Sequence, residues 1–176
     1  MRNQLVHLQV PWMISPSISG FRLTVSENDD ARVEVNVVNL SGKERIEEAF
    51  IDQRITLTFE DGQWVRTHPP YSDGEIIPPE RFDQSKIINP FAGIYTEGFQ
   101  ERFRRLNEAW ISSGNSFYSG IYKVEDSDWV KETNASRWGR EHYVLKGHDM
   151  WIEILARSVS WDEKEPFLSQ RENQLK

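Results

Sequence analysis

Two residues near the C-terminal end of the chain, His142 and Glu153, have types and a spacing that could carry out chemistry. They lie in the stretch EHYVLKGHDMWIE, residues 141–153, where two alternating polar and apolar runs flank the letters KGHD. Such a pattern predicts a β-hairpin. If Gly147 and His148 form the turn, His142 lies opposite Glu153, with Cβ atoms about 5 Å apart. A histidine beside a carboxylate is a usable general base and also a pair of metal ligands.

A second register is open, because a turn at His148-Asp149 moves every partner by two residues and places His142 opposite Leu155. Both registers keep the same apolar residues on one face, so the pattern does not choose between them. Two ligands are also fewer than the three of a catalytic zinc site. His68 or an acid from the loop after it could complete the set, although the spacing does not indicate this.

Motifs that would support an enzyme are missing from the sequence. It contains no H-E-x-x-H, G-x-S-x-G, glycine-rich phosphate loop or dinucleotide fingerprint. We therefore interpret the histidine–glutamate pair as a polar contact on the outer face of a sheet. A metal-assisted hydrolase centred on His142 and Glu153 is an alternative, and no cofactor is expected.

Aromatic residues are a second group of candidates, since the chain has seven tryptophans and aromatic residues make up 12% of it. Large rings stack on planar or sugar ligands and anchor protein interfaces. The candidate ligand- or partner-binding residues are Trp129, Trp138, Tyr122, Tyr143, Trp151, Phe82 and Tyr71. The favoured alternative is that these rings form the core and its rim.

The elements that must position these residues are mostly strands. Alternation in FRLTVSE (21–27) and RVEVNVVNL (32–40) predicts an antiparallel hairpin. Asp61-Gly62, flanked by alternating residues, predicts a second hairpin in which Phe59 faces Trp64.

One helix is expected at 97–113, where Phe99, Phe103, Leu106 and Trp110 form a single apolar stripe. Gly114 then supplies a C-terminal stop. For residues 41–50 the sequence does not decide between a helix and a loop, because Ser41 followed by Glu44 resembles a capping box.

A long loop is expected at 68–96, which contains two Pro-Pro pairs. Its apolar residues indicate that it packs on its own domain or on a partner. Residues 1–161 form a single β-rich domain in this interpretation, and 162–176 form a charged, frayed tail.

Composition limits the partners. Lys+Arg 21 against Asp+Glu 28 gives a net charge of -7, which opposes nucleic-acid binding and is compatible with a basic protein partner. No run approaches the roughly 18 apolar residues of a membrane span, and the N-terminus does not resemble a signal peptide. The chain has no cysteine, which fits a reducing compartment. A cytoplasmic location is expected.

These observations predict an α+β fold that is predominantly antiparallel β, as a curled sheet, sandwich or partly closed barrel with one amphipathic helix packed on it. The leading functional hypothesis is a small, soluble, non-catalytic binding protein that acts through a protein partner, as an inhibitor, immunity-type or accessory factor. The first alternative is a carrier or sensor for a small aromatic or sugar ligand, with an aromatic-lined cavity.

Overall fold

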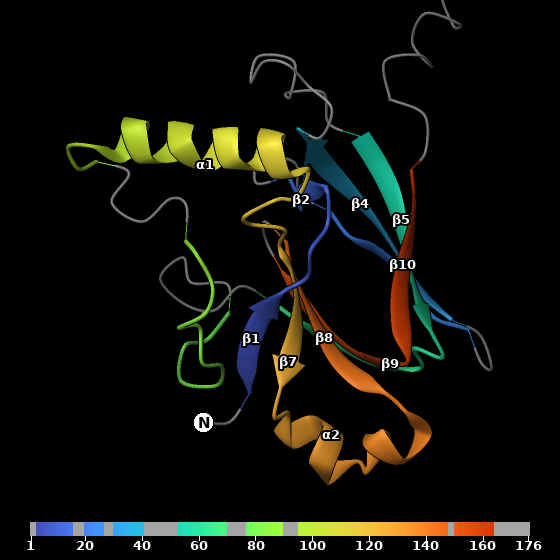
Figure 1. Ribbon diagram of the computed structural model, residues 1–176. Helices are drawn as coiled ribbons and strands as arrows, with labels where there is room; N and C mark the ends of the chain where they lie inside the picture. The colour runs from blue at the N-terminus through green and yellow to red at the C-terminus, as the bar shows by residue number, and fades with distance from the viewer. Residues whose placement is uncertain are drawn as a thin grey trace, which may run out of the picture.

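The computed structural model describes residues 3–15, 20–26, 30–40, 53–69, 77–89, 95–147 and 150–163. Its strands form two antiparallel sheets of five strands each, and one of them curls strongly into a half-barrel (Figure 1). In spatial order, sheet A contains β1 (Gln4–His7), β7 (Ile121–Glu125), β8 (Glu141–Lys146), β9 (Trp151–Ala156) and β6 (Trp64–His68). Sheet B contains β10 (Ser158–Glu163), β5 (Gln53–Glu60), β4 (Ala31–Asn39) and β2 (Trp12–Ile14), with β3 (Arg22–Thr24) also paired to β4. The predicted α+β, mostly antiparallel fold is confirmed.

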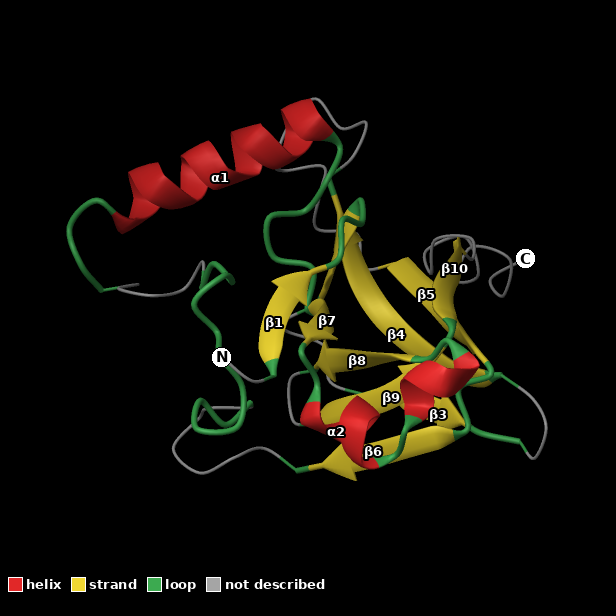
Figure 2. Ribbon diagram, turned by 60° about the horizontal axis from the view of Figure 1, so that its bottom comes forward, coloured by secondary structure: helices red, strands yellow, loops and turns green. Residues whose placement is uncertain are grey.

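The two helices α1 (Phe99–Ser113) and α2 (Asp128–Glu132) lie at opposite ends of the β structure (Figure 1, Figure 2). A short 3-10 helix, η3 (Ala135–Trp138), follows α2. The helix predicted at 97–113 is confirmed as α1, and Gly114 ends it in the left-handed region, at φ 72°.

The apolar stripe of α1 docks through its last turn. Trp110 is buried against Met13, Leu40 and Tyr118. Its Nε1 donates a hydrogen bond to the Pro11 carbonyl oxygen at 2.9 Å. The helix therefore lies across one end of the sheets, and its N-terminal part reaches beyond them (Figure 1).

The first predicted hairpin is confirmed, since β3 pairs with β4 and Leu23 lies opposite Val33. Along β4, Val33, Val35 and Val37 are buried while the residues between them are not. This period of two places one face of the strand in the core. Residues 41–50, where helix and loop were left open, lie outside the described residues.

The second predicted hairpin is wrong. Strand β5 pairs with β4 and β10, and β6 pairs with β9, so β5 and β6 belong to different sheets. Asp61 and Gly62 form a corner through which the chain passes from sheet B to sheet A. Beside this corner the chain bends again, because β9 belongs to sheet A, β10 belongs to sheet B, and only Arg157 separates the two strands. Asp61 anchors the corner through Arg140 Nη2, at 2.8 Å from its Oδ2.

Side chains from both sheets fill the space between them. The larger core cluster contains Val33, Val35, Val37, Ile55, Leu57 and Phe59 from sheet B, and Ile121, Tyr143, Leu145, Ile152 and Ile154 from sheet A. The interior of the half-barrel is therefore packed core, and a ligand site must be sought elsewhere.

Candidate functional site

The hairpin of β8 and β9 adopts the second of the two registers, with His142 opposite Leu155 and Val144 opposite Glu153. His142 and Glu153 nevertheless meet, because they are diagonal neighbours on the same face of the sheet. His142 Nε2 lies 3.1 Å from Glu153 Oε2.

The face of sheet A that carries this pair points away from sheet B, as predicted, but it is not exposed. Segment 77–89 of the long loop covers it, and Asp83 exchanges backbone hydrogen bonds with Asn3 and Leu5 of the first strand region. Glu153 is 0% exposed and His142 2%. The interpretation of the pair as a surface contact is therefore wrong: it lies under the loop.

A second apolar core forms between this face and the loop. It consists of Leu5, Ile77, Phe82, Tyr122, Val124, Val144 and Trp151. The described part of the long loop thus packs on its own domain, which was one of its two predicted uses. Residues 70–76 and 90–94 lie outside the described residues.

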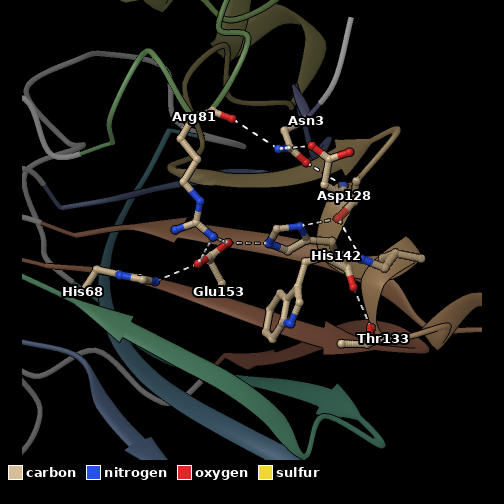
Figure 3. Close-up of polar contacts among 10 residues, drawn as sticks. Asn3, His68, Arg81, Asp128, Thr133, His142 and Glu153 are labelled. Atoms are coloured by element: carbon tan, nitrogen blue, oxygen red, sulfur yellow. Dashed lines mark hydrogen bonds and ion pairs between the residues drawn. The ribbon is translucent and has the colours of Figure 1, made fainter.

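Glu153 is the centre of a charged cluster (Figure 3). Arg81 Nη2 donates to both carboxylate oxygens, at 2.7 and 2.6 Å. His68 Nε2 lies 2.7 Å from Oε1, and its ring stacks on Trp151 with centroids 3.8 Å apart. A buried carboxylate is tolerated only when it is paired in this way.

The protonation states follow from these contacts. Burial alone would raise the pKa of Glu153, but His142, Arg81 and His68 outweigh it and hold this pKa below its ordinary value. For His142, burial lowers the pKa more than the contact with Glu153 raises it, and the charges of Arg81 and Arg66 lower it further. The site therefore combines an ionised Glu153 with a neutral His142.

Ser127 completes a chain of three residues whose types match a nucleophile, a base and an orienting carboxylate. Its Oγ lies 2.8 Å from His142 Nδ1 and accepts a hydrogen bond from the backbone N–H of Val130 as the N-cap of α2. Because Nε2 of the neutral His142 faces a carboxylate, we assign the ring proton to Nε2 and the hydroxyl hydrogen of Ser127 to Nδ1. Ser127 is 5% exposed and its hydroxyl is engaged by His142 and by Val130, and it lines a second pocket of about 420 Å³.

The same geometry argues against a metal ion at this position. His68, His142 and Glu153 do converge, but Arg81 occupies both carboxylate oxygens. Of the ring nitrogens of His142, Nδ1 is engaged by Ser127, while Nε2 lies 3.1 Å from Glu153 Oε2 without the geometry of a hydrogen bond. No group of three histidine, cysteine or carboxylate side chains that could hold a metal ion occurs among the described residues.

A pocket of about 370 Å³ opens beside the buried pair, between segment 77–89, α2 and β6. This volume lies at the small end of the range of about 300–1,000 Å³ that is typical of small-molecule sites. Its lining is mostly polar and includes Asn3 and His142, together with the rings of Phe82 and Trp129, which are 1% and 7% exposed. Asn3 is fixed by Asp128, whose Oδ2 accepts a hydrogen bond from Asn3 Nδ2 at 3.2 Å (Figure 3).

Comparison with protein-family models, curated proteins and solved structures finds no match to this chain. Function must therefore be argued from the site itself. No helix in the described ranges is long and apolar enough to cross a membrane.

The predicted aromatic residues do not gather in one place. Of these, Phe82 and Trp129 line the pocket, while Tyr122 and Trp151 belong to the second core under the loop. Tyr143 points into the main core between the sheets. Trp138 is 47% exposed and meets Trp64 edge to face. Tyr71 lies outside the described residues.

Two arginines of the site were not among the predicted residues. Arg66 was expected in a hairpin with β5, and its true neighbour Glu153 lies 87 positions later in the sequence. Arg81 lies in the loop, where periodicity gives no guide to side-chain direction. A signal for β6 did exist: Trp64, Arg66 and His68 alternate with Val65 and Thr67, so one face of this strand carries the large polar and aromatic groups.

Proposed function

We propose that this chain is a non-catalytic binding protein that takes a small ligand into the pocket beside Glu153. One observation carries the proposal: charged groups of both signs and the rings of Phe82 and Trp129 line one pocket, which lies beside the buried pair of His142 and Glu153. Most of the lining surface is polar, so the pocket suits a small polar or charged ligand. Of the functions predicted from sequence, a carrier or sensor fits best, with its cavity on the outer face of sheet A.

The contacts of the Glu153 cluster, within the described residues, support binding rather than catalysis. A general base needs a nitrogen or oxygen within reach of the substrate proton. Glu153 is held by Arg81 and His68, and the ring nitrogens of His142 face Glu153 and Ser127. These contacts make the cluster a rigid support for the pocket.

We place the protein in the cytoplasm within this proposal. The support is the cysteine-free sequence, which is suited to a reducing compartment.

A ligand screen read by tryptophan fluorescence tests the proposal, because Trp129 lines the pocket. The panel should contain free amino acids, short peptides, sugars, nucleotides and small aromatic acids. At least one compound is expected to change the emission in a saturable way, and Trp129→Phe is expected to remove most of that change.

Trp138→Phe is the matched control, since Trp138 is exposed and is not among the residues that line the pocket. It should leave the response intact. The proposal fails if no compound of the panel produces a saturable change, or if Trp138→Phe removes the response and Trp129→Phe does not.

A further inference from the structure

The rim of the pocket carries charges of both signs that do not pair with each other. Arg66 extends from β6, and Glu132 is the last residue of α2. Neither side chain forms an ion pair with any residue in the part of the chain that the structure describes. Trp129 lines the same pocket, and its ring centre is 4.0 Å from the guanidinium carbon of Arg66.

The position of Arg66 is informative because its cross-strand neighbour is Glu153. An arginine in this register could pair with that carboxylate, yet Arg81 and His68 hold Glu153 instead. The guanidinium of Arg66 lies over Trp129. Stacking uses the face of a guanidinium and leaves the N–H donors in its plane for another partner.

A ligand of a single charge sign fits this lining poorly. The positive charge of Arg81 is offset by Glu153, so an anion would be attracted by Arg66 and repelled by Glu132 and, less strongly, by Asp128, whose Oδ1 lies 3.9 Å from Lys131 Nζ. A cation would be attracted by these two carboxylates and repelled by Arg66. A molecule that carries both charges can satisfy the two sides at once.

We infer that the pocket binds a small zwitterion of the size of a free α-amino acid, and this inference rests on the proposed function. The ligand carboxylate pairs with Arg66, and its ammonium group lies toward Glu132. Its side chain lies toward Phe82 and Trp129, which line the pocket and are 1% and 7% exposed. The pocket volume of about 370 Å³ accommodates such a molecule without change in the fold.

Isothermal titration calorimetry with three matched sets of compounds tests the inference. The first set is the twenty free L-amino acids, the second their α-amides, and the third their N-acetyl derivatives. At least one free amino acid with an apolar side chain should bind. Its amide, which lacks the carboxylate, and its N-acetyl form, which lacks the ammonium, should each bind about 10- to 100-fold more weakly.

Two variants locate the charges. Arg66→Gln should weaken binding of the free amino acid about 10- to 100-fold and leave the affinity for its amide, which has no carboxylate, unchanged. Glu132→Gln should weaken binding of the free amino acid by a similar factor and leave the affinity for its N-acetyl form, which has no ammonium group, unchanged. Arg22→Gln and Glu97→Gln are the controls, since these exposed residues lie outside the pocket, and both should bind as the wild type does. Circular dichroism melts establish that each variant is folded.

The outcomes separate this inference from the proposed function. If a nucleotide, sugar or simple acid binds with the Trp129-dependent response while no amino acid does, the zwitterion is excluded and the binding function stands. If amide and N-acetyl forms bind as tightly as the free amino acid, the inference is also overturned. If nothing in either panel binds, both fail.

Discussion

At the scale of single residues, the buried carboxylate of Glu153 sets what its neighbours can do. It fixes Arg81 against the sheet, orders the ring of His68 and lies 3.1 Å from Nε2 of His142. Each partner that pairs with Glu153 is lost to a substrate, so the cluster shapes the pocket wall instead of reacting in it.

Removal of Arg81 should therefore be costly. Arg81→Met keeps much of the side-chain volume but leaves Glu153, 0% exposed, without its cationic partner. Breaking a buried pair from one side typically costs about 3–5 kcal/mol. We expect the free energy of unfolding, measured with urea, to fall by about this amount.

Lys86→Met is the control in the same loop. Lys86 pairs with Glu125, but both side chains are 51% exposed, so water screens the pair. Its removal should change the free energy of unfolding by less than about 1 kcal/mol. Equal costs for the two variants would contradict the assignment of Glu153 as a buried, ionised group.

His7 should make the stability depend on pH. Burial lowers its pKa from 6.5 to about 4, and neither ring nitrogen has a hydrogen-bond partner among the described residues. The unfolded chain therefore takes up a proton near pH 6.5, while the folded chain takes it up only near pH 4. Stability must fall as the pH falls through this window, by less than about 1.4 kcal/mol per pH unit for this one group.

His7→Phe keeps a ring beside Tyr122, whose centroid is 5.0 Å from that of His7, and removes the titration. Urea unfolding between pH 7.5 and 4.5 should show a shallower loss of stability than in the wild type. If the free energy of unfolding of His7→Phe falls with pH as steeply as that of the wild type, another group is responsible for the pH dependence. His142, whose pKa is also lowered, contributes equally to the pH dependence of both proteins.

The sequence could predict the residue types of the site but not their contacts. His142 and Glu153 were identified because a hairpin is local, and their meeting is insensitive to the choice between the two registers. Arg66 and Arg81 come from a strand and a loop more than 70 residues away from Glu153. Periodicity within a segment carries no information about such non-local pairing.

At the scale of secondary-structure elements, the corner at Asp61-Gly62 shapes the site. A true hairpin there would keep β6 beside β5 and away from β9. The corner instead delivers Trp64, Arg66 and His68 to the outer face of sheet A. The prediction failed because Asp-Gly fits a tight turn both in a hairpin and in a corner between two sheets. Which of the two forms depends on β10, a strand near the C-terminal end of the described residues, which pairs with β5.

Engineered disulfides can test this corner, since the chain has no cysteine of its own. Thr58 and Ser160 are cross-strand partners in β5 and β10. Directly opposed residues have Cα atoms within the roughly 4.4–6.8 Å that a disulfide spans. The double variant Thr58→Cys, Ser160→Cys should therefore form an intramolecular bond on mild oxidation, seen as loss of free thiols in the monomer.

The control pairs Thr58→Cys with Val65→Cys, which would be partners in a two-residue hairpin at Asp61-Gly62. This variant should keep its thiols under the same conditions. A disulfide in the control and none in the first variant would contradict the corner.

At the scale of the whole molecule, sheet A has two buried faces with different roles. One packs against sheet B in the main core, and the other carries the second core, the Glu153 cluster and the pocket. The fold class could be predicted because alternation marks strands directly. Large side chains fill the interior of the half-barrel, which the lengths of the apolar runs do not show.

The protein partner expected from the acidic composition stays a prediction. The net charge of -7 acts over the whole surface and does not select a contact face. The pocket supports a small ligand more directly, since its lining is specific in both shape and charge.

The most direct test of the central claim is a titration of ¹⁵N-labelled protein with the tightest compound of the panel, followed through the indole N–H signals. The Trp129 and Trp138 signals are assigned by their loss in Trp129→Phe and Trp138→Phe. We predict that the Trp129 signal shifts progressively to saturation while the Trp138 signal stays in place. A stationary Trp129 signal, with shifts confined to other tryptophans, would show that the ligand binds elsewhere and would contradict the account.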